Sequence, residues 1–143
     1  MRKSRRKARE FALKALYAWL LSAQAAEILA RDLRDEDEYS RIDERYFLFL
    51  LNGVIEHVAT LDLALRPYLD RDLKALSPIE HALLLIGAFE TWHAPDVPYK
   101  VVINEAVELA KAYGGTDGHK YINGVLDKLM PDARPHEGIP RKY

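Results

Sequence analysis

Apolar side chains recur along most of this chain at the spacing of an α-helix, and no segment shows the alternation of a β-strand. In the first apolar segment Leu13, Leu16, Tyr17 and Leu20 follow one another at intervals of three or four residues, which places them on one helical face. Every longer periodic segment has the same period. The pattern predicts an all-α protein of about seven helices, grouped into two subdomains that each approach a three-helix bundle.

The N-terminal half contains three further apolar segments. A second helix is expected over residues 25–33, and a third over residues 45–58 is apolar on most sides, which is typical of a buried helix. A short fourth helix should begin near residue 60 and end around Pro67, because proline interrupts the helical hydrogen-bond ladder. These helices form the first predicted subdomain, about residues 4–70.

The second predicted subdomain, about residues 77–130, opens on the strongest local signal in the chain. Ser77, Pro78 and Glu80 occupy the N-cap, the first helical position and the third helical position, which is the arrangement of a capping box. The helix that they open runs to about Trp92 and is almost wholly apolar. We expect it to be the central core helix.

Two more helices are expected around a glycine hinge in residues 98–129. Gly114 occupies the position of a left-handed helix cap, and the Thr116 hydroxyl could cap the helix that follows. Pro131 should stop that last helix. Residues 131–143 are then expected to be a flexible C-terminal tail.

The charge distribution is uneven although the formal net charge is only −1. With 143 residues, 49% of them hydrophobic, the chain suits a single domain, expected over residues 4–130. Six of the first nine residues are basic, so residues 1–9 form a basic arm from which Arg6 and Arg9 are expected to project. Positive charges are unfavourable at the N-terminus of a helix, where the helix dipole is itself positive. An arm with six of them therefore suggests a polyanionic partner. Residues 32–44 hold seven acids, which we interpret as a solvated segment without an assigned role.

Composition also excludes several classes of protein. The chain has no cysteine, which excludes disulfides, thiol catalysis and thiolate metal sites and fits a reducing compartment. No uninterrupted apolar run approaches the ~18–20 residues of a membrane span, and no signal-peptide core follows the basic start. We therefore expect a cytoplasmic protein without membrane association.

The signals for catalysis or metal binding are weak. Glu90 and His93 have the Glu-x-x-His spacing of a helical carboxylate metal site, but the second pair that such a site requires is missing. Glu105 and Glu108 share a helix face, and with Lys111 close by a surface ion pair is the favoured interpretation. We expect no enzymatic activity, no metal and no cofactor.

Recognition of single-stranded RNA requires aromatic faces for stacking, polar groups for base edges and cations for phosphates. Beyond the basic arm, the candidates are Tyr17, Tyr68, Tyr121, Asp117, Lys120 and Glu80. Structural alternatives remain open for most of them. Tyr17 lies on the apolar stripe of its helix, and Tyr121 could simply cover the core. The capping box already explains Glu80, and the helix dipole favours Asp117.

Three parts of the chain form longer and more specific patterns. One covers residues 5–19, one is Leu-Ser-Pro-Ile-Glu at residues 76–80, and one combines residues 97–111 with His-Lys-Tyr-Ile-Asn-Gly-Val-Leu-Asp-Lys at residues 119–128. Together they closely resemble the family of NusB, the bacterial transcription antitermination factor. The resemblance extends over roughly residues 5–130.

The resemblance implies a two-subdomain helical fold and a role in transcription. Proteins of this family bind the boxA element of nascent RNA, especially ribosomal RNA leaders, as a heterodimer with NusE, a small-subunit ribosomal protein. That pair joins other Nus factors on RNA polymerase and suppresses Rho-dependent termination. By resemblance, the RNA contacts fall on Arg5, Arg6, Lys7, Tyr17, Tyr68, Glu80, Lys120 and Tyr121. Glu80 and Asp117 also match positions associated with the partner surface.

A rival interpretation is a helical protein-interaction scaffold without specific RNA binding, such as a homodimer, in which the arm only increases solubility. The two interpretations differ in their dependence on salt. Phosphate contacts make the affinity for RNA fall steeply as the salt concentration rises, whereas an apolar dimer interface does not.

Overall fold

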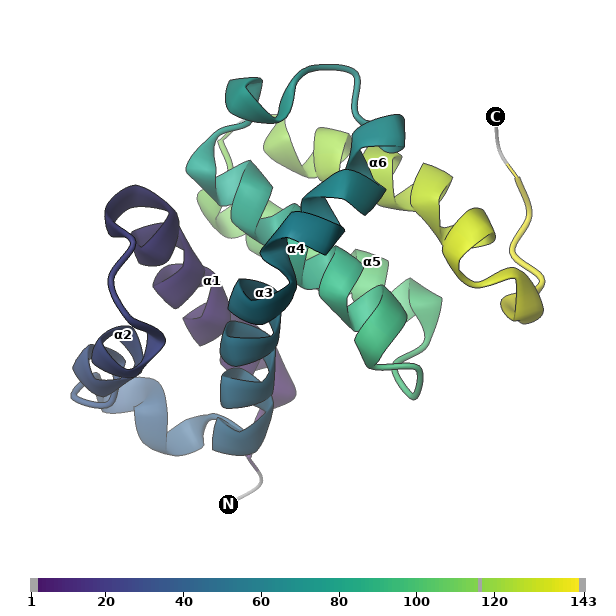
Figure 1. Cartoon of the computed structure of the whole chain (residues 1–143). Helices are drawn as coiled ribbons and strands as arrows, with labels where there is room; N and C mark the ends of the chain where they lie inside the picture. Colours follow the sequence, from purple (N-terminus) through teal and green to yellow (C-terminus); the bar gives the residue numbers. More distant parts are fainter. Residues whose placement is uncertain (1–2, 116, 142–143) are drawn as a thin grey trace.

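The computed structural model describes residues 3–115 and 117–141, and Figure 1 shows that they fold almost entirely into helices. The six α-helices are α1 (Arg5–Ser22), α2 (Ala26–Leu33), α3 (Glu44–Leu65), α4 (Pro78–His93), α5 (Tyr99–Tyr113) and α6 (Gly118–Ala133). The connections include four 3₁₀-helices: η1 (Asp37–Arg41), η2 (Arg66–Tyr68), η3 (Leu73–Ala75) and η4 (Pro135–Glu137). The all-α prediction is confirmed, and the helix count is close to the one expected.

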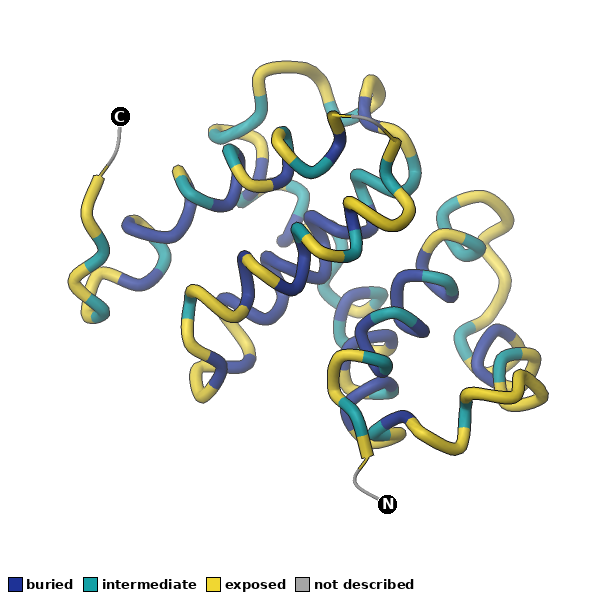
Figure 2. Tube along the Cα trace, turned by 180° about the vertical axis from the view of Figure 1, so that it is seen from behind, coloured by how far each residue is buried: buried dark blue, intermediate teal, exposed yellow. Residues whose placement is uncertain are grey.

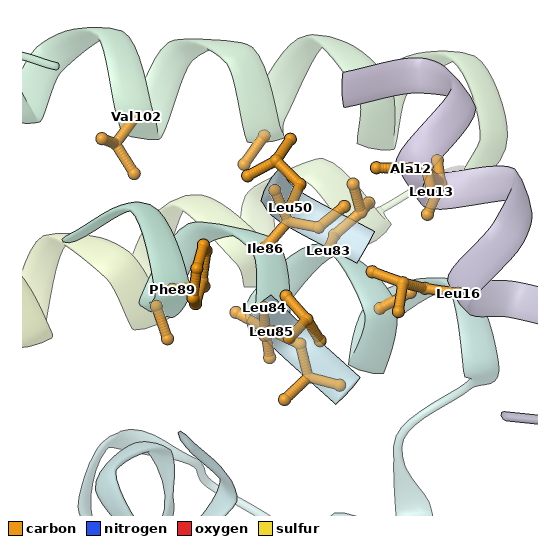
Figure 3. Packing of buried hydrophobic residues seen from close by; sticks show 14 of the residues in the cluster. Ala12, Leu13, Leu16, Leu50, Leu83, Leu84, Leu85, Ile86, Phe89 and Val102 are labelled. Carbon is orange, nitrogen blue, oxygen red and sulfur yellow. The ribbon is translucent and has the colours of Figure 1, made fainter. Parts of the chain in front are cut away.

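The helix α4 is the element on which the others pack. The Ser77 hydroxyl accepts a hydrogen bond from the Glu80 N–H at 3.1 Å, and the Glu80 carboxylate accepts one from the Ser77 N–H at 3.0 Å, so the predicted capping box is present. Residues 82–91 of α4 are all buried, because α1, α3, α5 and α6 each contact this helix. Figure 3 shows Leu16 of α1 and Leu50 of α3 among the side chains around α4.

One hydrophobic core runs through both halves of the chain. Figure 2 shows its buried residues along the inward sides of the helices, with exposed residues concentrated on the connecting segments. The helices α1, α2 and α3 contact one another, and so do α5 and α6, with α4 touching members of both groups. The subdomain limits at residues 4–70 and 77–130 stay a prediction.

The N-terminal half differs from the prediction in the length of α3. The sequence predicts a helix over residues 45–58 and a separate short helix after it, but the structure has one helix from Glu44 to Leu65. No proline or glycine separates the two parts, and Leu61 and Leu65 are buried on the same face as Val54. A continuous helix therefore buries more apolar surface than two short ones. Pro67 lies in η2 immediately after α3, as predicted for a residue that ends a helix.

The helices α3 and α4 approach each other closely at Gly53. A Cβ atom at this position would lie 2.1 Å from the nearest ring atom of Phe89, well inside van der Waals contact. The absence of a side chain therefore allows the Phe89 ring to lie against the backbone of α3. This contact allows α3 and α4 to pack closely at this point.

The segment Glu44–Tyr68 is the one helical stretch in the described part of the chain with the length and mean hydropathy, 1.5, of a membrane span. A core helix of a globular protein satisfies the same test. Here Phe47, Leu50 and Val54 are fully buried, and α3 packs against α1 and α4. We therefore assign α3 to the core of the bundle.

The hinge between α5 and α6 differs in detail from the prediction. Gly114 follows α5 with φ −97°, so the predicted left-handed cap is wrong at this position; Gly115 has the left-handed backbone, with φ +79°. The predicted cap Thr116 lies outside the described residues. Asp117 precedes the first turn of α6 without a side-chain capping hydrogen bond.

The end of α6 also lies beyond its predicted position. Pro131 is buried within the last turn, and the helix continues to Ala133. Proline removes only one hydrogen bond there, and its ring contributes to the core. Whether the remainder of residues 131–143 is flexible stays a prediction.

Arg134 joins the end of α6 to the end of α4. Its side chain is 2% exposed, and its guanidinium donates hydrogen bonds of 2.5–3.1 Å to the backbone oxygens of Glu90, Thr91, Ala94 and Val97. The last carbonyls of a helix lack intrahelical partners and carry a partial negative charge. A buried cation therefore satisfies several of them at once.

Candidate nucleic-acid interface

The predicted cationic residues Arg5, Arg6 and Lys7 lie together on the first turn of α1. Ser4 caps this turn, because its hydroxyl accepts a hydrogen bond from the Lys7 N–H at 3.0 Å. The Arg5 guanidinium lies 4.2 Å from the centre of the Tyr46 ring, 3.6 Å from the Asp96 carboxylate and 3.9 Å from that of Asp43. The arm is thus an ordered helix start from Arg5 onward.

The other two cations of the arm are also ion-paired. The Arg6 guanidinium makes a two-pronged contact with Glu105, with its shortest distance at 2.9 Å, and this hydrogen-bonded pair raises the pKa of Arg6. The Lys7 ammonium contacts the Glu38 carboxylate of η1. The Arg6 side chain is nevertheless 73% exposed, so a ligand can reach it from solvent.

Arg9 does not project from α1, contrary to the prediction. It is buried, and its guanidinium lies 2.8 Å from the Glu90 carboxylate and 3.3 Å from that of Glu105. The Tyr46 hydroxyl also donates to Glu90, and burial together with the charge of Glu90 raises the pKa of Tyr46. These groups form a network inside the bundle, in which the Arg9 guanidinium of α1 contacts the carboxylates of both Glu90 and Glu105.

The network also corrects the interpretation of two carboxylates. Glu105 was expected in a surface ion pair but is buried against α1; only Glu108 pairs with Lys111, at 3.5 Å. Glu90 is engaged by Arg9 rather than directed with His93 toward a metal. No cluster of three or more potential metal ligands occurs within the described residues.

The three candidate tyrosines have different surroundings. Tyr17 is 39% exposed, so its place on the apolar stripe does not make it a core residue; Leu16 occupies the core instead. The Tyr68 hydroxyl donates a hydrogen bond to Asp132 at 2.6 Å. Burial and this hydrogen bond raise the pKa of Tyr68 to about 12. Unlike Tyr68, Tyr17 has a ring that is exposed to solvent.

Tyr121 has a partner that the sequence did not indicate. The Arg71 guanidinium lies over its ring at 4.1 Å from the centre, a cation–π contact. Arg71 is itself held by Asp70 at 2.7 Å, a hydrogen bond that raises the pKa of Arg71, with a smaller contribution from Glu80. Nothing in the local sequence marks Arg71, because it lies in a loop distant along the chain from Tyr121.

Lys120 and Asp117 lie beside this contact at the start of α6. Their charged groups are 3.6 Å apart, and both side chains are about three-quarters exposed, at 74% and 77%. The segment between η2 and η3, which carries Arg71, runs alongside α6, because η2 contacts α6 and Tyr68 reaches Asp132 near its end. The structure thus gathers cations, an aromatic ring and carboxylates at one end of α6.

Six of the nine predicted site residues fall into two groups, and Tyr17, Tyr68 and Glu80 lie outside both. Arg5, Arg6 and Lys7 lie at the N-terminal end of α1, and Tyr121, Lys120 and Asp117 lie at the start of α6 with the newly identified Arg71. The helix α1 has 18 residues and spans about 27 Å, and Tyr17 lies in its second half. Figure 1 shows the N-terminal end of α1 and the loop between η2 and η3 at opposite ends of the molecule. A ligand touching both groups must be extended.

Comparisons with known proteins show the family to which this chain is similar. The family model described as the NusB family matches residues 6–131. A transcription antitermination protein NusB from Thiobacillus denitrificans is 52% identical over 134 residues, which cover 94% of this chain and 92% of that protein. The solved structure of T. maritima NusB superposes with a TM-score of 0.84 at 27% identity, covering 96% of this chain and 97% of that one.

A second solved structure contains partners. It is a complex of the antitermination factors NusB and NusE with double-stranded RNA, and it matches with a TM-score of 0.82 at 24% identity, over 90% of this chain and 96% of that chain. At this identity the likeness concerns the fold. The family match and the close relatives together establish that this chain belongs to the NusB family of transcription antitermination factors, a family of non-catalytic proteins.

Proposed function

We propose that this protein binds boxA-type single-stranded RNA in nascent transcripts, chiefly ribosomal ones, in a pair with NusE. The pair then joins RNA polymerase and other Nus factors and suppresses Rho-dependent termination. Membership in the family supports the role in transcription, and the complex of a NusB with NusE and RNA supports the two partners. The RNA in that complex is double-stranded, so the preference for single strands is part of the proposal.

The observation that carries the proposal is the group formed by Tyr121, Arg71, Lys120 and Asp117 at the start of α6. Readout of unpaired bases needs a ring for stacking, cations for phosphates and polar groups for base edges. The structure holds a ring and a guanidinium 4.1 Å apart and places an exposed cation and carboxylate on the adjoining helical turn. A protein-interaction scaffold has no need for this combination.

The remaining predicted residues receive roles by their location. At the N-terminal end of α1, phosphates are bound by Arg5, Arg6 and Lys7. Tyr17, exposed in the second half of α1, stacks on a base. Tyr68, whose hydroxyl donates to Asp132, contacts the RNA alongside α6. Glu80 and Asp117 act at the boundary between the RNA and NusE. Glu80 performs this role in addition to its capping hydrogen bond.

Fluorescence anisotropy tests the proposal directly. The probes are a labelled boxA-like strand and a scrambled strand of equal length, each measured at two salt concentrations with and without NusE. We expect tighter binding to the boxA-like strand, an increase with NusE and a steep fall of affinity with salt. Equal and weak binding to both strands would contradict sequence-specific recognition and favour the scaffold interpretation. Sedimentation of the free protein then tests for the homodimer.

A further inference from the structure

Part of the acidic stretch of residues 32–44, which was expected to be solvated, lies against the basic face of α1. Two of its carboxylates reach lysines of that helix: Glu38 contacts the Lys7 ammonium at 2.5 Å, and Glu36 contacts the Lys14 ammonium at 3.0 Å. Both contacts join α1 to the start of η1 or the residue before it, so they depend on the tertiary fold. A shallow groove between the two elements is lined by Phe11, Lys14 and residues 35–38.

The two lysines share one face of α1. They are seven residues apart, which is two helical turns or about 10 Å along the axis. Tyr17 follows Lys14 by three residues on the same face and is exposed. Lys7, Lys14 and Tyr17 thus form a line that leads from the basic arm toward the tyrosine.

Both ion pairs are accessible to a competing anion. The carboxylate side chains of Glu36 and Glu38 are 44% and 51% exposed, and the lysine side chains of Lys14 and Lys7 are 36% and 32% exposed. The hydrogen bond with Lys7 lowers the pKa of the Glu38 carboxyl group. Exposed pairs of this kind are weak. A phosphate can therefore replace the carboxylate without disturbing the core.

We propose that Glu36 and Glu38 occupy, in the free protein, the positions that RNA phosphates take at Lys14 and Lys7, and that RNA must displace them to bind along α1. The inference rests on the proposed function and extends it in two ways. It adds Lys14 to the RNA-contacting residues, and it makes the acidic segment an internal competitor that lowers affinity for RNA of any sequence.

The competition has a definite dependence on salt. Ions in solution weaken both the lysine–carboxylate pairs and the repulsion between the carboxylates and the incoming RNA. The affinity lost to the competitor is therefore greatest at low salt. Removing the two carboxylates should increase the affinity most under those conditions and steepen the fall of affinity with salt.

The test is a set of four proteins: the natural chain, E36Q/E38Q, K7Q/K14Q and the quadruple variant. Each is titrated against the boxA-like and the scrambled strand at two salt concentrations. We expect E36Q/E38Q to bind both strands about fivefold more tightly at low salt, since each exposed pair contributes about a two- to fivefold effect. In the K7Q/K14Q background the same two changes should have little effect, because the competed cations are gone.

The matched control is E27Q/E56Q, which alters the net charge equally at two exposed carboxylates that form no ion pair within the described residues. An equal gain in this control, or an undiminished gain in the K7Q/K14Q background, would show a general field effect and overturn the inference. Circular dichroism of all variants checks that the helices are retained.

Comparison of the boxA-like RNA with the scrambled RNA distinguishes failure of this inference from failure of the proposed function. If E36Q/E38Q gains affinity through the two lysines but neither protein prefers the boxA-like strand, the inference holds and sequence-specific recognition fails. If the natural chain prefers the boxA-like strand and E36Q/E38Q binds no more tightly than the control, the proposed function holds and the inference is wrong. Absence of binding to either strand by every variant contradicts both.

Discussion

The Arg9 guanidinium of α1 lies 2.8 Å from the Glu90 carboxylate of α4, and both side chains are at least 95% buried. Residues 81 positions apart in the chain thus share one charge pair inside the bundle. The Tyr46 hydroxyl donates a second contact to Glu90, and Arg9 also reaches Glu105, which Arg6 contacts from the solvent side. The pair joins the first helix to the central one.

Loss of one partner of this pair should destabilise the fold strongly. Glu90→Ala leaves the Arg9 charge buried with a single remaining carboxylate, and removal of one member of a buried pair costs about 3–5 kcal/mol. Urea denaturation followed by circular dichroism measures the change. The exposed pair of Glu108 and Lys111 supplies the control, since Glu108→Ala should alter the free energy of unfolding by less than about 1 kcal/mol. Similar effects in both variants would show that the buried pair contributes no more than a surface one.

Arg134→Ala should also lower stability. The variant removes the Arg134 donor from the backbone oxygens of Thr91 and Val97, whereas those of Glu90 and Ala94 still accept the N–H groups of Ala94 and Val97. Each buried group left unsatisfied costs about 1–3 kcal/mol. We expect a total loss of about 3–5 kcal/mol in the free energy of unfolding, since water will reach some of these oxygens. Arg141→Ala removes only an exposed contact with Asp132 and serves as the comparison. A loss below 1 kcal/mol in Arg134→Ala would contradict the bridging role.

Two glycine substitutions should act in opposite directions. Gly53→Ala places a methyl group 2.1 Å from a ring atom of Phe89, so α3 and α4 must separate or the ring must move; overpacking of this kind costs about 1–3 kcal/mol. Gly124→Ala in α6 meets no atom within 4 Å, so only the better helix propensity of alanine acts, a gain of up to about 1 kcal/mol. Thermal denaturation of the two variants tests the pair. Equal shifts would mean that the contact at Gly53 relaxes without cost.

Tyr121→Ala should weaken binding of RNA if a base stacks on this ring. Loss of one stacking platform costs about 1–3 kcal/mol of binding free energy. Tyr113→Ala is the matched control, because Tyr113 is 42% exposed on α5 and belongs to neither group of the interface. Anisotropy titration with the boxA-like strand gives both affinities. Unchanged binding by Tyr121→Ala would remove this ring from the interface and leave the role of the basic arm intact.

The stability of the fold should fall as the pH is lowered through the range in which His93 titrates. Burial, followed by the charge of His57, whose ring is stacked 4.6 Å away, lowers the pKa of His93 below the ordinary value of 6.5. Between the lowered pKa and 6.5 the unfolded chain binds more protons than the folded one, so the free energy of unfolding rises with pH in this window. The contribution of His93 to the free energy of unfolding is therefore lost as the pH falls through this window.

Urea denaturation at several pH values between 5 and 7.5 measures this slope. His93→Gln should flatten it, whereas His136→Gln, at an exposed position of η4, should leave it unchanged. A slope that persists in His93→Gln would assign the pH dependence to other groups.

The all-α class, the start of α4 and most of the candidate residues could be predicted from the sequence alone. These features depend on interactions between residues three or four positions apart, which the chain order displays directly. The capping box of Ser77 and Glu80 is the clearest case, because both of its hydrogen bonds form within one helical turn. The resemblance to the NusB family likewise rests on continuous segments of the sequence, such as residues 5–19 and 97–111.

The tertiary structure decided which charges are available to a ligand and which are consumed in the interior. Arg6 and Arg9 are alike in sequence, yet Arg6 is exposed and Arg9 is buried against Glu90. Likewise Arg71 reaches Tyr121 only because the loop after η2 folds along α6. Such contacts join residues far apart in the chain, and their geometry depends on how whole helices pack. Local sequence rules carry no information about that packing, so only the folded molecule reveals them.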